Sequence, residues 1–271
     1  MSEGRVDGKV VVVTGAARGQ GAAEAYALAA QGATVIATDI SFDEKAELDT
    51  AGTGRIINCR LDVTDPTAWA ALADDVRTEF GEVHGLVNNA GATHRARLLD
   101  VELADWERMF RINATGPLLG IQAMTPLMHP GASIVTIGSV AAITPHYTVA
   151  YTASKWAARG LSKVASVELG PLGIRANTIH PGYIETPMVA NAPSEFRQAN
   201  LTANPLGVLG VVDDVAHLVV YLISDESRFV SGAEIAVDGG FSNQAGVKFL
   251  SDAVRTNSPE ASRKAATWAP S

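Results

Sequence analysis

Three polar residues in the second half of the chain have side chains suited to acid–base chemistry at an oxygen atom. Tyr151 and Lys155 are four residues apart, so a helix would place both on one face, and Ser139 lies twelve residues before Tyr151. A phenol with a pKa of about 10 is a poor base at neutral pH, and lowering that pKa to about 7 requires roughly 4 kcal/mol of preferential stabilisation of the phenolate. The Lys155 ammonium group could contribute to that stabilisation, and the Ser139 hydroxyl could donate to an oxygen on which negative charge develops.

A glycine-rich turn near the start of the chain is suited to binding a pyrophosphate. The valine run at residues 10–13 is followed by Gly15, Gly19 and Gly21 and then by an alanine-rich helical pattern over residues 22–31. Glycines allow positive φ angles and a close approach of the backbone to a phosphate, while the helix N-terminus presents unpaired N–H groups. A tight turn also needs glycine, and the Gly-x3-Gly-x-Gly spacing differs from the commonest fingerprint. The strand–turn–helix context nevertheless favours a dinucleotide site.

Asp39 stands at the end of the second predicted strand, eighteen residues beyond Gly21. A carboxylate at this place can accept hydrogen bonds from the ribose hydroxyls of adenosine, and its charge repels a 2′-phosphate. Arg18 is the one conflicting signal, because a basic residue in the loop could pair with such a phosphate. A cap for a helix over residues 41–48 is the structural alternative for Asp39, and it is compatible with ribose binding. We therefore predict NAD, rather than NADP, as the cofactor.

The scaffold predicted for these residues is a doubly wound, Rossmann-type α/β fold. Short runs rich in β-branched residues alternate with helical patterns, and Asp65 with Pro66 predicts the start of one helix. Such alternation implies right-handed crossovers and a seven-stranded parallel sheet, in the order 3-2-1-4-5-6-7, with helices on both faces. The predicted strands lie at residues 10–13, 33–37, 55–57, 85–87, 133–137, 174–179 and 234–237.

The domain prediction is one dinucleotide-binding and catalytic domain over residues 6–240, followed by a C-terminal tail over residues 241–271. The tail is either frayed or an arm that packs on a neighbouring subunit or over the substrate mouth. Apolar side chains motivate the second interpretation, and these are Val247, Phe249, Leu250 and Trp268.

Composition excludes several classes of protein. The 21 Lys and Arg against 29 Asp and Glu give a net charge of -8, which argues against nucleic acid or an anionic membrane as a partner. The single cysteine, Cys59, excludes an internal disulfide framework, and no apolar run reaches the roughly 20 residues of a membrane span. We expect a cytoplasmic protein. The six histidines show no metal-ligand spacing and are interpreted as structural, so no metal is expected, and a Gly-x-Ser-x-Gly hydrolase motif is absent.

Taken together, the motifs resemble those of the short-chain dehydrogenase/reductase family over about residues 6–240. The resemblance implies that Ser139 orients and polarises the substrate oxygen, that Tyr151 transfers the proton, and that Lys155 lowers the Tyr151 pKa and binds the nicotinamide ribose. It also implies that Asn113 kinks its helix and holds a water in the proton relay. The residues that carry the resemblance are Thr14, Gly15, Gly19, Gly21, residues 88–91 (Asn-Asn-Ala-Gly), Ser139, Tyr151, Lys155, Pro181 and Gly182.

The remaining site predictions concern the cofactor and the substrate. Asp62 ends the third strand, where its carboxylate could accept from the adenine amino group; the alternative for Asp62 is capping of the helix that starts at Asp65, or solvation. Residues 180–188 resemble the family segment that contacts the nicotinamide carboxamide. Residues 184–205 are predicted to form a mobile lid. The predicted cofactor residues are Gly15, Arg18, Gly19, Gln20, Gly21, Asp39, Asp62, Val63, Asn89, Ala90, Gly91, Tyr151, Lys155, Pro181, Gly182, Ile184 and Thr186. The candidate substrate-pocket residues are Thr93, His94, His146, Tyr147, Tyr183 and Met188.

Two departures from the family pattern affect the catalytic segment. The family often has a pair of serines at the end of the fifth strand, whereas Gly138 precedes Ser139 here. The spacing from Ser139 to Tyr151 is also one residue shorter than in many members, so the loop over residues 140–150 is expected to have a different shape.

The function predicted from these residues is NAD-dependent oxidoreduction between a secondary alcohol and a ketone, with Tyr151 as the general acid and base. The resemblance is nearest to bacterial secondary-alcohol and hydroxysteroid dehydrogenases, and it implies a homotetramer. One alternative is a 3-oxoacyl reductase, although such enzymes usually use NADPH and Asp39 argues against that cofactor. The other is a non-catalytic NAD-binding sensor or scaffold, which the intact Ser139, Tyr151 and Lys155 disfavour.

Overall fold

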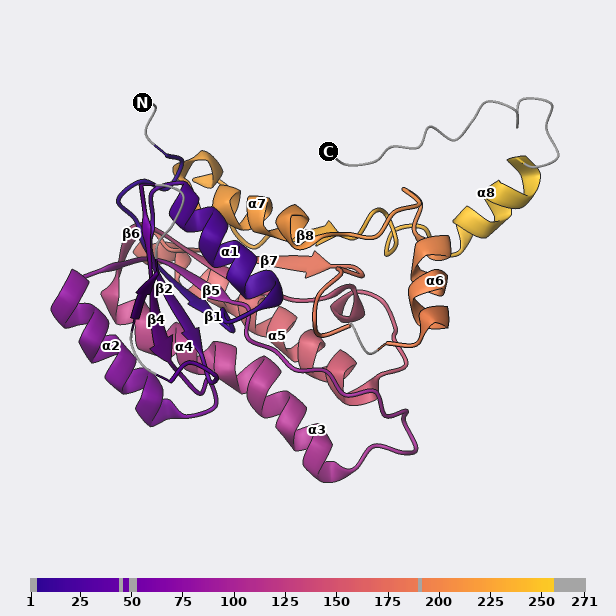
Figure 1. The fold of residues 1–271 in the computed structure, drawn as a ribbon, viewed down its shortest axis with the longest axis horizontal. Helices are drawn as coiled ribbons and strands as arrows, with labels where there is room; N and C mark the ends of the chain where they lie inside the picture. The colour runs from indigo at the N-terminus through magenta and orange to yellow at the C-terminus, as the bar shows by residue number, and fades with distance from the viewer. Residues whose placement is uncertain (1–3, 44–45, 49–52, 190–191, 256–271) are drawn as a thin grey trace.

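A single β-sheet lies at the centre of the fold (Figure 1). The computed structural model describes residues 4–43, 46–48, 53–189 and 192–255. Seven parallel strands follow the order β4-β2-β1-β5-β6-β7-β8, which is the predicted order 3-2-1-4-5-6-7 and confirms the Rossmann-type fold. Their bounds are β1 Val10–Thr14, β2 Thr34–Asp39, β4 Arg55–Arg60, β5 Val83–Asn88, β6 Met128–Ile137, β7 Arg175–Pro181 and β8 Glu234–Val237.

A short eighth strand extends the sheet at one edge. β3 (Ala46–Leu48) pairs with β4 in the antiparallel direction, so that Glu47 lies opposite Ile57. The alternative interpretation of residues 41–48 as a helix capped by Asp39 is therefore wrong for residues 46–48. Three residues are too few for a hydrophobic period to distinguish a strand from a helix.

Helices cover both faces of the sheet (Figure 1). The two layers are held by separate buried apolar clusters, one under α1 and α7 and the other under α2, α4 and α5. The bounds of these five helices are α1 Gly19–Ala30, α2 Pro66–Phe80, α4 Gly116–Met124, α5 Val149–Glu168 and α7 Val212–Ile223.

The side chains of β1 show how one strand serves both layers. Val11 and Val13 belong to the cluster under α1 and α7, whereas Val10 and Val12 belong to the cluster on the opposite face. Successive side chains of a strand point to opposite faces, so a strand covered on both sides is apolar throughout. The uninterrupted valine run is thus accounted for by the position of β1 in the middle of a parallel sheet.

Three further helices lie outside these two layers. α3 (Leu103–Phe110) continues through a π-helical turn, Arg111–Thr115, into α4. α6 (Ser194–Ala203) and α8 (Val247–Arg255) lie beyond the edge of the sheet (Figure 1). Phe249 of α8 lines a groove with residues of α6. The rest of the predicted tail, including Trp268, falls outside the described residues. Within the described ranges, the structure contains no helix with the length and apolar character needed to cross a membrane.

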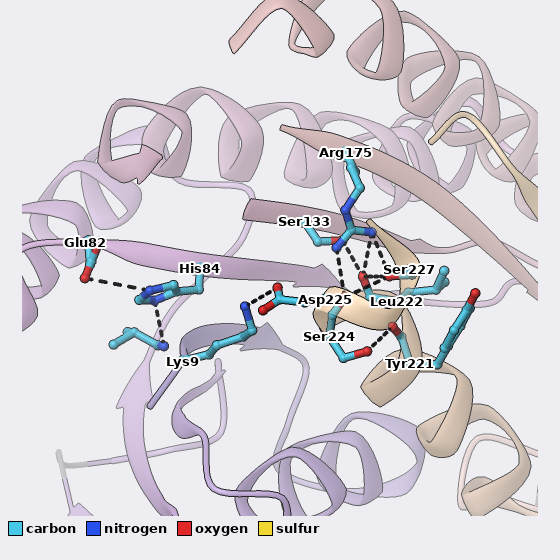
Figure 2. A network of polar contacts seen from close by, with 11 residues as sticks. Lys9, Glu82, His84, Ser133, Arg175, Tyr221, Leu222, Ser224, Asp225 and Ser227 are labelled. Carbon is cyan, nitrogen blue, oxygen red and sulfur yellow. Dashed lines mark hydrogen bonds and ion pairs between the residues drawn. The ribbon is translucent and has the colours of Figure 1, made fainter. Parts of the chain in front are cut away.

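A buried arginine secures the amino end of the sheet. Arg175, the first residue of β7, donates to the carbonyl oxygens of Leu222 (2.9 Å) and Ser224 (3.3 Å) and to Oγ of Ser227 (2.9 Å). Figure 2 shows the guanidinium directed at this turn, where Ser133 Oγ also donates to Leu222 O. The last carbonyls of a helix lack partners within the helix, so Arg175 satisfies the C-terminal end of α7.

Replacing Arg175 with methionine should therefore destabilise the fold more than removal of a surface ion pair. Methionine retains much of the apolar volume but removes three buried hydrogen bonds from a charged donor, so we expect a loss of about 3 kcal/mol in the free energy of unfolding. The control is Arg5→Met, which breaks the exposed pair with Glu226 and should cost much less stability. Urea unfolding curves measure both values, and equal losses would contradict this role for Arg175.

Candidate active site

The end of β6 and the first turns of α5 bring Ser139, Tyr151 and Lys155 together. Ser139 Oγ accepts the Ala141 N–H at 3.1 Å and shares a hydrogen bond with the Tyr151 side chain. Lys155 Nζ lies 5.9 Å from the centre of the Tyr151 ring and donates to the carbonyl of Ile137 at 2.8 Å. Two groups able to exchange protons and one ammonium group therefore meet at the carboxyl edge of the sheet, where ligands of open α/β sheets bind.

Tyr151 is held as a neutral phenol by the protein alone. Burial raises its pKa above the ordinary value, and the hydrogen bond with Ser139 opposes that rise without cancelling it. The family resemblance implies a lowered Tyr151 pKa when the cofactor is bound. Such a pKa therefore requires more positive charge near Tyr151 than the protein alone supplies.

Lys155 shares its buried surroundings with an acid that the sequence analysis did not single out. Burial lowers the pKa of Lys155 to about 8, and the charge of Glu24 opposes this shift. Glu24 of α1 is completely buried, and neither of its carboxylate oxygens has a hydrogen-bond partner among the described residues. Burial raises its pKa to about 8, opposed by the charge of Lys155. The two residues are thus electrostatically linked across the site.

The position of Glu24 in the helix could have indicated its burial. The buried residues of α1 include Gly21, Ala25 and Leu28, and Glu24 lies among them at the i, i+3, i+4, i+7 spacing of a core-facing stripe. A glutamate on such a stripe is rare unless it is paired, so this exception could have been noted from the sequence.

Asn113 joins the chain after β5 to α5. Its Oδ1 accepts the N–H of Ala92 at 2.9 Å, and its Nδ2 donates to the Ala92 carbonyl at 3.0 Å and to Ser154 Oγ at 2.9 Å. It lies within the π-helical turn between α3 and α4, and single π turns often occur at functional sites. Because its side chain is fully engaged, Asn113 holds the segment before α3 against the helix that carries Tyr151 and Lys155.

The glycine loop packs tightly against the end of β5. Gly15 has a φ of +68°, and a Cβ there would lie 2.8 Å from Cα of Ala90. A Cβ at Gly21 would lie 2.3 Å from Asn89 Nδ2. Thr14 Oγ1 accepts the N–H groups of Asn89 and Ala90, both at 3.0 Å, which joins β1 to β5 at this point.

The N-terminus of α1 has the features that a bound pyrophosphate requires. Arg18, the N-cap residue, is exposed and provides no side-chain cap, and Oε1 of Gln20 is buried without a partner among the described residues. A Cβ at Gly19 would have its nearest neighbours at 3.7 Å, on Thr186 and Pro187. The N–H groups at the start of α1 therefore lack a side-chain cap and lie beside the segment predicted to contact the nicotinamide, so the residues present fit a dinucleotide.

The two predicted acidic residues have different partners. Asp39 Oδ2 accepts the N–H of Ala17 in the glycine loop at 3.2 Å, and its Oδ1 accepts the N–H and hydroxyl of Ser41 at 2.9 and 2.8 Å. Asp62 Oδ1 accepts the N–H and hydroxyl of Thr64 at 2.9 and 2.8 Å. Asp39 is thus directed toward the glycine loop, while Asp62 stabilises the turn after β4, which also contains Val63.

The segment after β7 closes the other side of the predicted cofactor site. Pro181 ends β7, and the N–H of Gly182 donates to the Val237 carbonyl at 2.9 Å. Ile184 is buried and forms a bridge with Gly210, which fixes the start of the predicted lid. Gly91, on the opposite side, lies beside Lys155, because a Cβ there would be 3.4 Å from Lys155 Nζ.

Aromatic side chains gather between the catalytic loop and α6. The rings of His146 and Tyr147 stack with centres 4.7 Å apart, and the Phe196 ring lies 6.3 Å from each of them and 5.9 Å from Tyr183. Three predicted pocket residues are therefore brought together by Phe196, which the sequence analysis missed. An aromatic residue within the predicted lid was the available signal.

The other candidate pocket residues are not part of this cluster. His94 Nε2 lies 3.2 Å from Asp105 of α3, Met188 is half-exposed, and Thr93 is partly buried. Among the residues that the structure describes, no group of three or more His, Cys, Asp or Glu side chains is placed to hold a metal ion.

The sequence is similar to those of known dehydrogenases and reductases. A family model described as enoyl-(acyl carrier protein) reductase matches residues 15–242. The 3-alpha-(or 20-beta)-hydroxysteroid dehydrogenase of Mycobacterium bovis is 44% identical over 248 residues, covering 88% of this chain and 90% of that protein. The trans-4-hydroxycyclohexanecarboxylate dehydrogenase of Sinomonas cyclohexanicum is 40% identical, covering 87% and 93%. The NADP-dependent (R)-specific alcohol dehydrogenase of Lentilactobacillus kefiri is 38% identical, covering 89% and 99%.

Replacing Glu24 with glutamine should remove a pH-dependent loss of stability. Because the pKa of Glu24 is raised in the folded protein, its contribution to stability is fully present below the unfolded pKa of 4.5 and is lost as the pH rises through about 8. The free energy of unfolding of Glu24→Gln, relative to the unchanged protein, should therefore increase by about 4 kcal/mol from about pH 5 to about pH 8. Urea unfolding at several pH values measures this difference. Glu107→Gln, an exposed change on α3, is the control, and a pH-independent difference for Glu24→Gln would contradict the assignment.

Proposed function

Because the chain belongs to the short-chain dehydrogenase/reductase family, we propose that it is an NAD-dependent oxidoreductase that interconverts a secondary alcohol and a ketone. The observation that carries the proposal is the meeting of Ser139, Tyr151 and Lys155 beside a glycine loop that fits a pyrophosphate. The alcohol and hydroxysteroid dehydrogenases to which the chain is similar support the class of substrate.

The cofactor would be held along the carboxyl edge of the sheet. The glycine loop and the N-terminus of α1 would bind the pyrophosphate, Asp39 the adenosine ribose, and Lys155 the nicotinamide ribose. When bound, the nicotinamide supplies hydride transfer to or from the substrate carbon.

The chain's own residues manage the proton and the substrate oxygen. Ser139 Oγ accepts the Ala141 N–H, so the backbone leaves its hydrogen free, and a substrate oxygen would replace Tyr151 as the acceptor of that hydrogen. Tyr151, which shares a hydrogen bond with Ser139, takes the proton from an alcohol during oxidation and returns it during reduction. The phenolate form of Tyr151 that this exchange requires would be stabilised by the Lys155 ammonium group together with the positive charge of a bound, oxidised nicotinamide.

Asp39 is the basis for NAD as the cofactor. Its carboxylate contacts the glycine loop through Ala17, so a 2′-phosphate on the adenosine ribose would meet a negative charge. Two observations favour NADP: Arg18 is exposed at the same loop, and one similar protein is named as NADP-dependent. The proposed preference for NAD therefore requires that repulsion of a 2′-phosphate by Asp39 exceeds its attraction by Arg18.

The aromatic cluster favours a substrate with a bulky apolar body. The rings of His146, Tyr147, Tyr183 and Phe196 offer flat apolar surface between α6 and the loop that follows Ser139, and burial lowers the pKa of His146 so that its neutral form is favoured. A cyclic or steroid secondary alcohol suits these rings better than a short aliphatic one. A 3-oxoacyl thioester is the competing substrate class.

Tyr151→Phe should abolish turnover and retain cofactor binding. The substitution removes only the hydroxyl that exchanges the proton, so kcat should fall by about 100-fold or more while the Kd for NADH stays within about twofold. The assay uses secondary alcohols from short aliphatic to steroid, together with a 3-oxoacyl thioester, each with NAD(H) and NADP(H). A wild-type protein that binds NADH but turns over none of these substrates would instead support a sensor or scaffold.

Asp39→Ala should shift the cofactor preference toward NADP. Loss of the carboxylate removes both the ribose hydrogen bonds and the repulsion of a 2′-phosphate, so the ratio of kcat/KM for NADP to that for NAD should rise by about tenfold or more. Asp62→Ala is the matched control, since its carboxylate serves a turn after β4. An unchanged ratio in Asp39→Ala would refute the role of Asp39.

A further inference from the structure

A buried histidine lies directly behind the catalytic serine. His180 of β7 is completely buried, and its Nδ1 atom lies 3.0 Å from the Ser139 carbonyl oxygen and 3.4 Å from the Ser139 amide nitrogen. Its other ring nitrogen, Nε2, lies 3.4 Å from Oε1 of Glu234 on β8. The imidazole therefore connects the peptide groups of Ser139 to a carboxylate on the neighbouring strand.

Glu234 belongs to a wider group of charges that also contacts the catalytic turn. Arg159 of α5 pairs with both carboxylate oxygens, and Lys163 Nζ lies 2.9 Å from Oε2. These cations lower the pKa of Glu234 to about 2, so it is ionised at neutral pH. Arg159 also donates to the carbonyl of Ala142 at 3.1 Å, at the end of the turn that Ser139 begins. The charges that face His180 are thus Glu234 from β8 and Arg159 from α5.

The two contacts of His180 Nδ1 require opposite positions of a proton. The Ser139 N–H can only donate and its carbonyl can only accept, so Nδ1 without hydrogen suits the first group and Nδ1–H suits the second. Neutral His180 with its hydrogen on Nε2 donates to Glu234 and accepts from the Ser139 N–H. Protonated His180 donates to both Glu234 and the Ser139 carbonyl. Burial lowers the pKa of His180, and the contacts with Glu234 and the Ser139 backbone oppose that shift without cancelling it, so the neutral form is favoured at neutral pH.

Gly138 provides the space that His180 occupies. A Cβ at residue 138 would lie 2.6 Å from Nδ1 and 2.9 Å from Cε1 of His180, so a serine there would require the ring to move. Gly138 stands where the family often has the first serine of a pair. The absence of a side chain there lets the His180 ring pack against the backbone of Ser139.

We propose that His180 is a positioning residue for Ser139, that Glu234 and Arg159 hold its ring in place, and that protonation of the ring reorients the peptide groups beside the serine hydroxyl. This inference rests on the proposed function, in which Ser139 polarises the substrate oxygen. The neutral ring, which accepts the Ser139 N–H, supports the active arrangement, so activity declines as His180 becomes protonated.

The kinetic test compares His180 with a histidine in a similar setting far from the site. His84 of β5 also accepts a backbone N–H, from Val10 at 3.1 Å, and faces a carboxylate, Glu82, at 3.7 Å (Figure 2). With the best alcohol of the panel, His180→Ala should lower kcat by about tenfold or more, with the KM for NAD within about twofold, while His84→Ala leaves kcat nearly unchanged. His180→Asn keeps a polar group near the position of Nδ1 and should recover most of kcat.

The pH profile separates positioning from simple packing. The wild-type kcat should fall on the acid side with the titration of His180, and His180→Asn should lose that limb. Glu234→Gln should move the limb to lower pH, because the negative charge that favours protonated His180 is removed. Equal losses of kcat in His180→Ala and His84→Ala, or an acid limb that persists in His180→Asn, would overturn the proposal.

A measurement on the protein without cofactor or substrate distinguishes failure of this inference from failure of the proposed function. In protein labelled with ¹⁵N-serine and ¹³C-histidine, the amide signal missing from Ser139→Ala identifies Ser139, and the ring signal missing from His180→Asn identifies His180. The Ser139 amide shift should titrate with the same midpoint as the His180 ring and should become pH-independent in His180→Asn. A His180 ring that does not titrate, or an unresponsive Ser139 amide, would refute the inference even if alcohols are turned over.

Discussion

The hydrogen bonds between Thr14 and the Asn89–Ala90 segment are the interaction on which the rest of the site depends. Thr14 Oγ1 accepts two backbone N–H groups, and Asn89 Nδ2 donates to the carbonyls of Thr14 and Gly15 at 2.8 and 3.2 Å. They join the end of β1 to the end of β5 so closely that only glycine fits at positions 15 and 21. From there Asn113 links Ala92 to Ser154, and thereby to the helix that carries Tyr151 and Lys155. The proposed pyrophosphate site and the proposed catalytic groups are therefore positioned by one continuous set of contacts.

The parts of the fold that could be predicted are those with a local physical cause. The valine run of β1 is apolar because both its faces are covered, and Asp65 does cap α2, accepting the Thr67 N–H at 2.8 Å. The order of the parallel strands follows from the crossover rules and the family resemblance. β3 was missed because a three-residue edge strand carries no period and pairs in the antiparallel direction.

The parts of the site that could not be predicted depend on partners distant in the sequence. His180 meets Ser139 across 41 residues and Glu234 across 54, so no local pattern distinguished it from the other histidines. Phe196 joins the aromatic cluster only because α6 packs over the loop that contains His146 and Tyr147. Glu24 differs, because its place on the buried stripe of α1 was visible in the sequence and only its link to Lys155 required the structure.

Hydride transfer from a secondary alcohol to NAD is the central claim, and following the transferred atom tests it most directly. The protein would be incubated with NAD and a cyclic secondary alcohol that carries deuterium on its hydroxyl-bearing carbon, and the mass of the reduced cofactor would be measured. The account predicts NADH that carries one deuterium, together with the corresponding ketone. Reduced cofactor without deuterium, or no reduction of NAD by any alcohol from short aliphatic to steroid, would contradict it.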